Sequence, residues 1–235
     1  MKSRLIAIEG IDGSGKSTLV EYIYSRLKSE GYNANCIVTC EKEKESVYRA
    51  VIDSYDLDPL SPAYMFFYQV LHAKKTDRAF AALDKEEIVI ADRWDLSFIV
   101  WHKNFGFFSE ESPQLLEGVS RLAFRGLKPN LGIYLDITLS NALDRRLNHR
   151  KEVIDDIKLE KRIYNKALST YKKLARQNNW KIVNPNKSLD EVKESVWKLV
   201  SQAIKEDVPP REISWRVKTR ENLELKMAKV LFRRR

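Results

Sequence analysis

Residues 10–18 have the types and spacing of a phosphate-binding loop. An apolar run at 5–8 precedes them and a helical pattern follows. Glycines remove the Cβ atoms that would keep the backbone from closing around a ligand, so successive N–H groups can converge on phosphate oxygens. A lysine supplies a mobile charge for the outer phosphates, and the hydroxyl beside it suits Mg²⁺. The predicted triphosphate-binding residues are Gly10, Gly13, Ser14, Gly15, Lys16, Ser17 and Thr18.

A second candidate for chemistry is the pair Asp92-Arg93, which directly follows the apolar run 88–91. A carboxylate there can hold Mg²⁺ or orient an attacking oxygen, and the adjacent guanidinium can bind an anion with two parallel hydrogen bonds. An ordinary ion pair at a strand end is the alternative. Beside a phosphate loop the pair favours catalysis, with Ser17 and Asp92 as metal ligands.

The basic segment 144–151 is the third candidate. Arg146 and Arg150 are four residues apart, so on a helix they share one face and can point at one anionic group. Phosphoryl transfer needs positive charge over the moving group and exclusion of water. We therefore expect a lid near 146–158 whose arginines cover the phosphate loop. A solvated charged helix turn is the alternative.

The elements that must position these residues alternate along the chain. Short β-rich runs are expected at 5–8, 35–39, 88–91, 131–135 and 181–183. Helical segments are expected near 16–30, 61–83, 113–126, 139–148, 157–178 and 188–205. This alternation predicts an α/β fold of the P-loop NTPase type, with a five-stranded parallel sheet and helices on both faces. Ligands of such sheets bind outside the carboxyl ends of the strands, where the candidate residues fall.

The charge of the chain is concentrated at its C-terminus. Of the net charge of +9 over 235 residues, residues 209–235 hold nine Lys or Arg against three Glu, which leaves +3 for residues 1–208. We therefore expect a kinase-sized domain at 1–205 and a partly helical basic extension at 206–235. Apolar positions within the extension favour packing on the body or on a second copy, as a homodimer, over binding to nucleic acid.

No apolar run reaches membrane-spanning length, and the first residues lead into a core strand without a signal-peptide pattern. The sequence therefore predicts a cytoplasmic protein that does not enter a membrane.

Together these motifs resemble the thymidylate kinase family, and the likeness spans roughly residues 4–203. It rests on Ile8-Glu9-Gly10-Ile11-Asp12-Gly13-Ser14-Gly15-Lys16-Ser17-Thr18, Ile88-Val89-Ile90-Ala91-Asp92-Arg93-Trp94, Pro129-Asn130-Leu131-Gly132-Ile133-Tyr134-Leu135-Asp136 with Ala142-Leu143, and Tyr171-Lys172-Lys173-Leu174-Ala175. The resemblance implies a nucleoside monophosphate kinase that uses ATP and Mg²⁺ to phosphorylate dTMP to dTDP.

The resemblance also implies roles for individual residues. Asp12 matches the carboxylate that reaches the sugar hydroxyl of the acceptor nucleotide. Asp92 and Arg93 match the pair that handles Mg²⁺ and the acceptor phosphate, and Ser97 falls where a serine lines the acceptor site. The lid would carry the catalytic arginine, as in family members whose phosphate loop has glycine rather than arginine after the aspartate.

The chain departs from the family pattern in three regions that contact the acceptor. The usual Arg-Glu-Pro-Gly-Gly is replaced at 39–44, the usual Asp-Arg is replaced near 68–72, and the usual Tyr-Gln is replaced at 101–102. Aromatic faces can stack on a base, and a carboxylate or imidazole can read its polar edge, although core packing is the alternative for the aromatics. The predicted acceptor residues here are Glu41, Phe66, Phe67, Trp101 and His102.

Two other functions remain open from the sequence. A deoxynucleoside kinase would use Glu41 as general base on a nucleoside hydroxyl, but Arg93 suits an acceptor that already carries a phosphate. A nucleotide-binding regulatory protein would explain the altered acceptor motifs and the basic extension.

Overall fold

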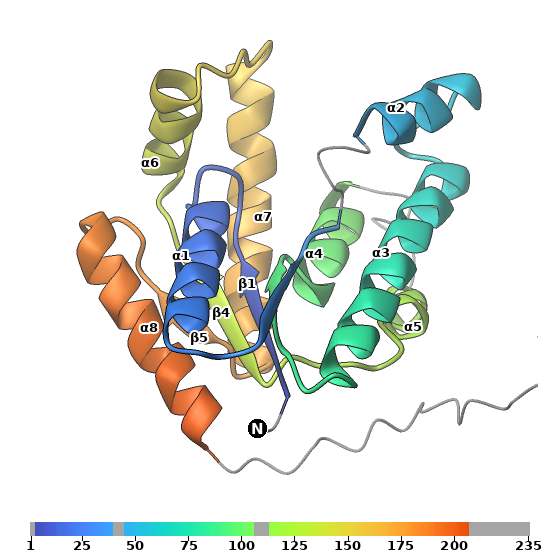
Figure 1. The fold of residues 1–235 in the computed structure, drawn as a ribbon. Helices are drawn as coiled ribbons and strands as arrows, with labels where there is room; N and C mark the ends of the chain where they lie inside the picture. Colours follow the sequence, from blue (N-terminus) through green and yellow to red (C-terminus); the bar gives the residue numbers. More distant parts are fainter. Residues whose placement is uncertain (1–2, 40–44, 106–112, 207–235) are drawn as a thin grey trace, which may run out of the picture.

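The computed structural model describes residues 3–39, 45–105 and 113–206, and within these ranges the fold is a parallel sheet covered by helices (Figure 1). The sheet has five strands in the order β2-β3-β1-β4-β5. All four pairings are parallel, with β1 at the centre between β3 and β4. The strands are β1 (Arg4–Glu9), β2 (Ala34–Ile37), β3 (Ile88–Asp92), β4 (Leu131–Leu135) and β5 (Lys181–Val183). The predicted fold class is confirmed.

Helices lie on both faces of the sheet. One face packs against α1 (Lys16–Ser29) and α8 (Leu189–Lys205). The other packs against α3 (Pro62–Leu83), α4 (Asp95–Phe105), α5 (Pro113–Phe124) and α7 (Ile157–Gln177). Helix α2 (Glu45–Ser54) precedes α3, and α6 (Leu139–Asp144) continues into a π-helix at Arg145–His149. Among the helices described here, none is both long and apolar enough to cross a membrane.

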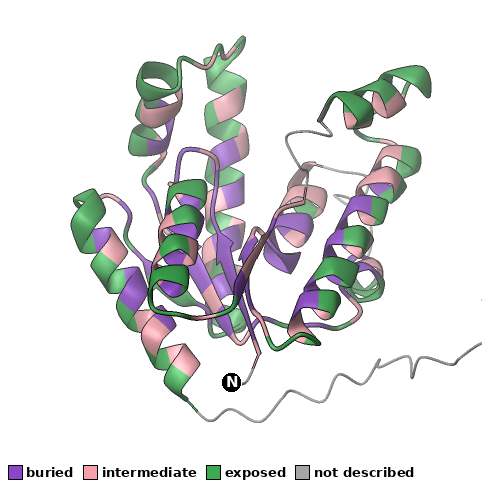
Figure 2. Cartoon of the chain, in the orientation of Figure 1, coloured by how far each residue is buried: buried purple, intermediate pink, exposed green. Residues whose placement is uncertain are grey.

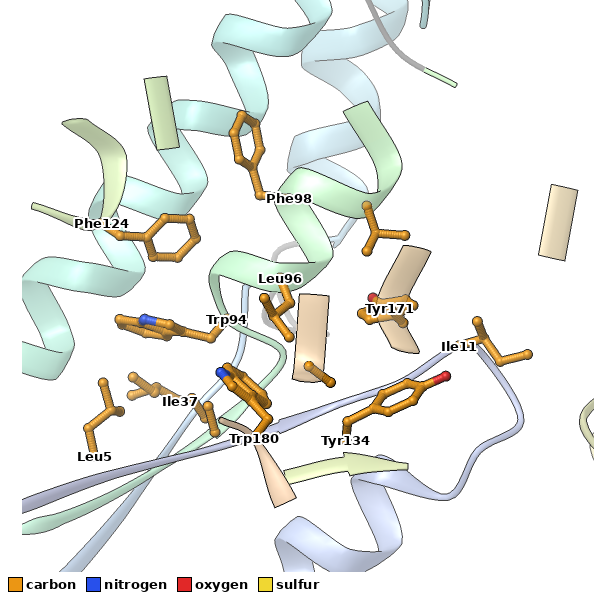
Figure 3. Close-up of a cluster of buried hydrophobic side chains, with 14 of the residues drawn as sticks. Leu5, Ile11, Ile37, Trp94, Leu96, Phe98, Phe124, Tyr134, Tyr171 and Trp180 are labelled. Carbon is orange, nitrogen blue, oxygen red and sulfur yellow. The ribbon is translucent and has the colours of Figure 1, made fainter. Parts of the chain in front are cut away.

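The central strands β1, β3 and β4 are buried along most of their length. Every residue of β1 is buried, as Figure 2 shows for the middle of the sheet. On the face of α3, α4, α5 and α7, large aromatic side chains fill the space over the sheet (Figure 3). Trp94 and Phe124 lie with ring centroids 5.1 Å apart, and Tyr134 stacks on Tyr171 at 5.5 Å. This packing fixes where α4 and α7 stand relative to the carboxyl end of β3.

Local signals explain where several elements begin. The Ser61 side chain accepts a hydrogen bond from the N–H of Tyr64 and caps α3, and Ser188 forms a capping box with Glu191 at the start of α8. At the opposite end of the sheet from the phosphate loop, the Arg4 guanidinium donates to the carbonyls of Ala203 and Glu206, which fastens the end of α8 to β1. The basic extension beyond residue 206 lies outside the described residues.

The sequence did not predict α2 and α4. Helix α4 is apolar on most of its circumference, since Leu96, Phe98 and Val100 are all buried, and so it lacks the one-sided apolar stripe that identifies a surface helix. The expected helix 139–148 also differs, because its second half is a π-helix in which the N–H of Arg150 donates to the carbonyl of Arg145 at 3.0 Å.

Candidate active site

The phosphate loop connects the carboxyl end of β1 to the first turn of α1 (Figure 1). Gly13 has a φ of +82° and Gly15 a φ of +94°, conformations that L side chains rarely adopt. A Cβ atom at Gly13 would also collide with the carbonyl oxygen of Ala142 in α6. The loop conformation therefore requires glycine at these two positions, and the backbone at Gly13 lies close to α6. Thr18 lies exposed in the first turn of α1.

Lys16 is folded back into the loop. Its ammonium donates to the carbonyl of Ile11 at 2.9 Å and lies 3.8 Å from the carboxylate of Asp12. Burial, assisted by repulsion from Arg93, lowers the pKa of Lys16 to about 8. Phosphates bound in the loop would favour the charged form of Lys16. The Lys16 ammonium is therefore better stabilised when a phosphate is bound than when the loop is empty.

The two predicted metal ligands lie together. Ser17 donates from its Oγ to Oδ2 of Asp92 at 2.9 Å, although the two residues are 75 positions apart in the chain. Hydroxyl and carboxylate oxygens suit Mg²⁺, which usually takes one or two protein ligands and completes its shell with phosphates and water. The residues present therefore fit this ion.

Arg93 reaches from the end of β3 to the phosphate loop. Its Nη1 donates to the carbonyl of Gly10 at 3.1 Å and to Oγ of Ser97 at 3.2 Å, and its Nη2 donates to the carboxylate of Asp12. Burial would raise the pKa of Asp12, but Arg93 and Lys16 outweigh burial and lower it to about 2. Asp12, Arg93 and Lys16 thus lie around one point.

The fully buried carboxylate of Glu9 bonds the residues that follow Arg93. Glu9 accepts hydrogen bonds from the main-chain N–H of Trp94 at 2.7 Å and of Ser97 at 2.9 Å. Its Oε2 also accepts from the hydroxyl of Ser97, whose Oγ lies 2.8 Å from the hydroxyl of Tyr171. Burial raises the pKa of Glu9, although Arg93 opposes that shift. The network ties β1, α4 and α7 to one side of Arg93.

Arg146, in the segment predicted to be a lid, is paired with two carboxylates. Its guanidinium donates to Glu152 at 2.7 Å and to Glu160, and lies 5.0 Å from the centroid of the Tyr164 ring. The hydroxyl of Tyr164 in turn donates to Oδ2 of Asp12 at 2.9 Å. Arg146 is therefore connected to Asp12 through Tyr164.

Two other lid arginines differ from each other in position. Arg150 is half exposed, and its nearest carboxylate is Glu152 at 3.5 Å. Arg145, which the sequence did not single out, donates to the carbonyl of Pro185 at 2.7 Å and to that of Gly13 at 3.4 Å. The structure thus brings Arg145 to the phosphate loop and leaves Arg150 at the surface.

The predicted acceptor residues separate into two groups. The Trp101 ring lies edge-on to Tyr164 with centroids 5.7 Å apart, and the hydroxyl of Tyr164 bonds Asp12. The His102 ring instead packs on Phe98 with centroids 4.5 Å apart. Burial lowers the pKa of His102 to about 4. Phe66 is 60% exposed on α3. Phe67 contacts Tyr48 and Tyr68, and Glu41 lies outside the described residues.

Sequence reasoning missed several residues that contact the site: Glu9, Lys75, Arg145, Tyr164 and Tyr171. The signals for three of them were present. Glu9 belongs to the first segment of the family resemblance and Tyr171 begins the fourth, and Arg145 belongs to the basic segment from which other arginines were chosen.

Comparisons with known proteins agree with this geometry. The family model for thymidylate kinase matches residues 8–196. The chain belongs to the thymidylate kinase family. It is 32% identical over 204 residues to a probable thymidylate kinase of Sulfolobus acidocaldarius, covering 83% of this chain and 95% of that protein. It is 27% identical over 210 residues to a thymidylate kinase of Staphylococcus epidermidis, covering 86% of this chain and all of that protein.

A third thymidylate kinase, from Prochlorococcus marinus, is 25% identical over 206 residues and covers 83% of this chain and 94% of its own length. These matches confirm the family predicted from the motifs. The range matched by the family model also includes the segments in which the acceptor motifs depart from the family pattern, so those departures occur within a family member.

Proposed function

We propose that this protein transfers the γ-phosphoryl group of ATP to dTMP and produces dTDP and ADP. The observation that carries the proposal is the meeting of Arg93 and Asp12 beside Lys16. A guanidinium that suits an acceptor phosphate therefore lies within reach of a loop that suits a triphosphate donor. Thymidylate kinases use ATP as phosphoryl donor with Mg²⁺, and the oxygens of Ser17 and Asp92 suit that ion.

The charge of the acceptor explains why the site needs no strong general base. A phosphate monoester is largely a dianion at neutral pH, so its oxygen can attack the γ-phosphorus while the bond to the bridging oxygen of ADP breaks. Arg93 orients that phosphate, and Asp12 is placed to accept a hydrogen bond from a sugar hydroxyl. Bound Mg²⁺ would screen charge between the phosphates. Neither the nucleoside kinase nor the regulatory alternative gains support from the comparisons.

The lid residues have a proposed division of roles. Arg145 lies against the loop and would contribute positive charge to the donor side. Arg146 lies over Tyr164, whose hydroxyl bonds Asp12, and would act on the acceptor side once Glu152 and Glu160 release it. Developing charge on the transferred group is stabilised when fixed cations surround it.

A coupled assay of ADP release tests the function. The purified full chain is mixed with ATP, Mg²⁺ and each deoxynucleoside monophosphate or free nucleoside in turn. We expect dTMP to give the highest kcat/KM and thymidine to give no turnover. Turnover of nucleosides alone would refute the proposal, and a Lys16→Met preparation controls for contaminating kinases.

The predicted homodimer, cytoplasmic location and partners of the basic extension remain predictions. An exposed apolar stripe on α3, with Phe66 at 60% and Val70 at 58% exposure, is the surface we expect a second copy to cover. Light scattering tests this, because Phe66→Glu should convert a dimer to a monomer. A mass unchanged by the substitution would exclude this stripe.

A further inference from the structure

Lys75 is a buried lysine of α3 that lies at the carboxyl ends of two strands. The residue is 1% exposed. Its ammonium donates to the main-chain carbonyl of Asp92 at 2.7 Å, to that of Arg93 at 2.6 Å and to Oγ1 of Thr39 at 3.1 Å. These three acceptors use the three donors of an ammonium group. The Nζ also lies 5.6 Å from the ring centroid of Trp94.

The two carbonyls flank a residue in an unusual conformation. Arg93 has a φ of +65°, in the left-handed region that costs a non-glycine residue free energy. The N–H groups of the same two peptides are also bonded, Arg93 to the carbonyl of Ile8 at 2.9 Å and Trp94 to Glu9 at 2.7 Å. Both peptides on either side of the Arg93 Cα are thus fixed, their N–H groups by β1 and their carbonyls by Lys75.

This turn decides where the guanidinium points. The side chain leaves the end of β3 and returns across the sheet to Gly10 and Asp12 of the phosphate loop. A rotation of either flanking peptide would move the guanidinium away from that position. A misplacement of about 1 Å can cost on the order of 100-fold in rate when a group must meet a reacting atom.

A lysine is a costly residue for filling this space. Burying an ammonium costs more than burying an apolar chain of similar volume, unless its hydrogen bonds are specific and complete. Burial lowers the pKa of Lys75 to about 7. The carboxylates of Asp92 and Glu9 act to raise that pKa, and the guanidinium groups of Arg93 and Arg78 act to lower it. The use of an ammonium, with every donor on a defined acceptor, indicates a hydrogen-bonding role rather than packing alone.

We propose that Lys75 is a positioning residue of this enzyme, which holds the left-handed turn at Arg93 and so aims the guanidinium at the acceptor phosphate. The inference deepens the proposed function and rests on it for the identity of the acceptor. Its structural part, the dependence of the Arg93 conformation on Lys75, stands independently of the substrate.

The test compares Lys75→Met with a matched control, Lys74→Met, one position earlier on the exposed side of the same helix. We expect Lys75→Met to lower kcat/KM for dTMP about 100-fold, through both a higher dTMP KM and a lower kcat, and to change the KM for ATP less than about twofold. Lys74→Met should leave all parameters within about twofold of the parent. Equal losses toward dTMP and ATP, or no loss toward dTMP, would overturn the inference.

A second variant keeps the test decisive if Lys75→Met does not fold. Lys75→Gln keeps two N–H donors without the charge and should show the same selective loss toward dTMP, smaller in size. A crystal structure of either folded variant then shows the turn directly, and we expect φ of Arg93 to leave the left-handed region. A φ still near +65° would overturn the inference whatever the substrate, whereas a parent protein inactive on dTMP would overturn only the proposed function.

Discussion

Replacing Arg93 with lysine separates the geometry of the acceptor site from its charge. Arg93 uses two nitrogens, one toward Gly10 and Ser97 and the other toward Asp12. Lysine keeps the positive charge but offers a single ammonium on a shorter and more flexible chain, which cannot bind a phosphate through two parallel hydrogen bonds. Arg93→Lys therefore removes the paired N–H donors of the guanidinium and retains the positive charge.

The expected loss follows from the number of contacts. A hydrogen bond to a charged group contributes about 1.5–3 kcal/mol, and at least one such contact to the acceptor phosphate is lost. A loss of about 2–4 kcal/mol in the transition state lowers kcat/KM for dTMP about 30- to 1,000-fold. We propose that the loop amides and Lys16 form the ATP site, so the KM for ATP should change less than about threefold.

The assay is ADP release at saturating ATP with dTMP varied, followed by the converse experiment. Arg125→Lys is the matched control, because Arg125 pairs with Asp77 at 3.1 Å on an exposed surface, where such pairs contribute about 0–1 kcal/mol. If Arg93→Lys keeps kcat/KM for dTMP within threefold of the parent, the paired N–H donors of Arg93 do not bind the acceptor phosphate. A rise in the KM for ATP equal to that for dTMP would contradict the assignment as well.

Three further predictions concern the loop, the lid and the core. Lys16→Met should lower kcat at least about 1,000-fold with an unchanged circular dichroism spectrum, since the loop cation is lost; activity near that of the parent would contradict its role. Arg145→Ala should raise the KM for ATP about tenfold and Arg150→Ala less than about threefold, because only Arg145 contacts the loop; equal effects would exclude the assignment. Burial lowers the pKa of His72 from 6.5 to about 3. The unfolded chain therefore binds the extra proton below pH 6.5, and unfolding free energy should fall by about 2 kcal/mol between pH 7.5 and 5 on account of this group. Denaturant titrations should show a smaller loss for His72→Leu, and an equal loss would show that His72 is not the responsible group.

The part of the site that is local in sequence was predictable. The loop glycines, Lys16 and Ser17 lie within one turn and one helix start, so their spacing alone specifies their arrangement. Asp92 was also accessible, because the carboxyl ends of parallel strands meet at one edge of a sheet. The fold class followed for the same reason, since short apolar runs alternating with helical segments leave few topologies.

Contacts that depend on how the helices pack against one another were not accessible. Arg93 and Tyr171 are 78 residues apart, and their contact depends on how α7 packs against α4. The lid shows a different limit. The argument from four-residue spacing assumes an α-helix, but the π-helix at Arg145–His149 changes the angle between successive side chains. Arg145 therefore faces the loop while Arg150, chosen by α-helical spacing, lies at the surface.

The charges of the site also indicate what acceptor binding must change. In the structure Arg93 is already paired with Asp12, and Tyr164 donates to the other oxygen of the same carboxylate. A bound phosphate would compete with Asp12 for the guanidinium. The carboxylate would then keep Tyr164 and Lys16 as partners, and a sugar hydroxyl could replace the hydrogen bond that Arg93 no longer donates. An acceptor that offers both a phosphate and a hydroxyl satisfies Arg93 and Asp12 together. A free nucleoside offers the hydroxyl alone, so Arg93 would gain no new partner, and the pairing of this arginine with this acid thus favours a nucleoside monophosphate on charge balance alone.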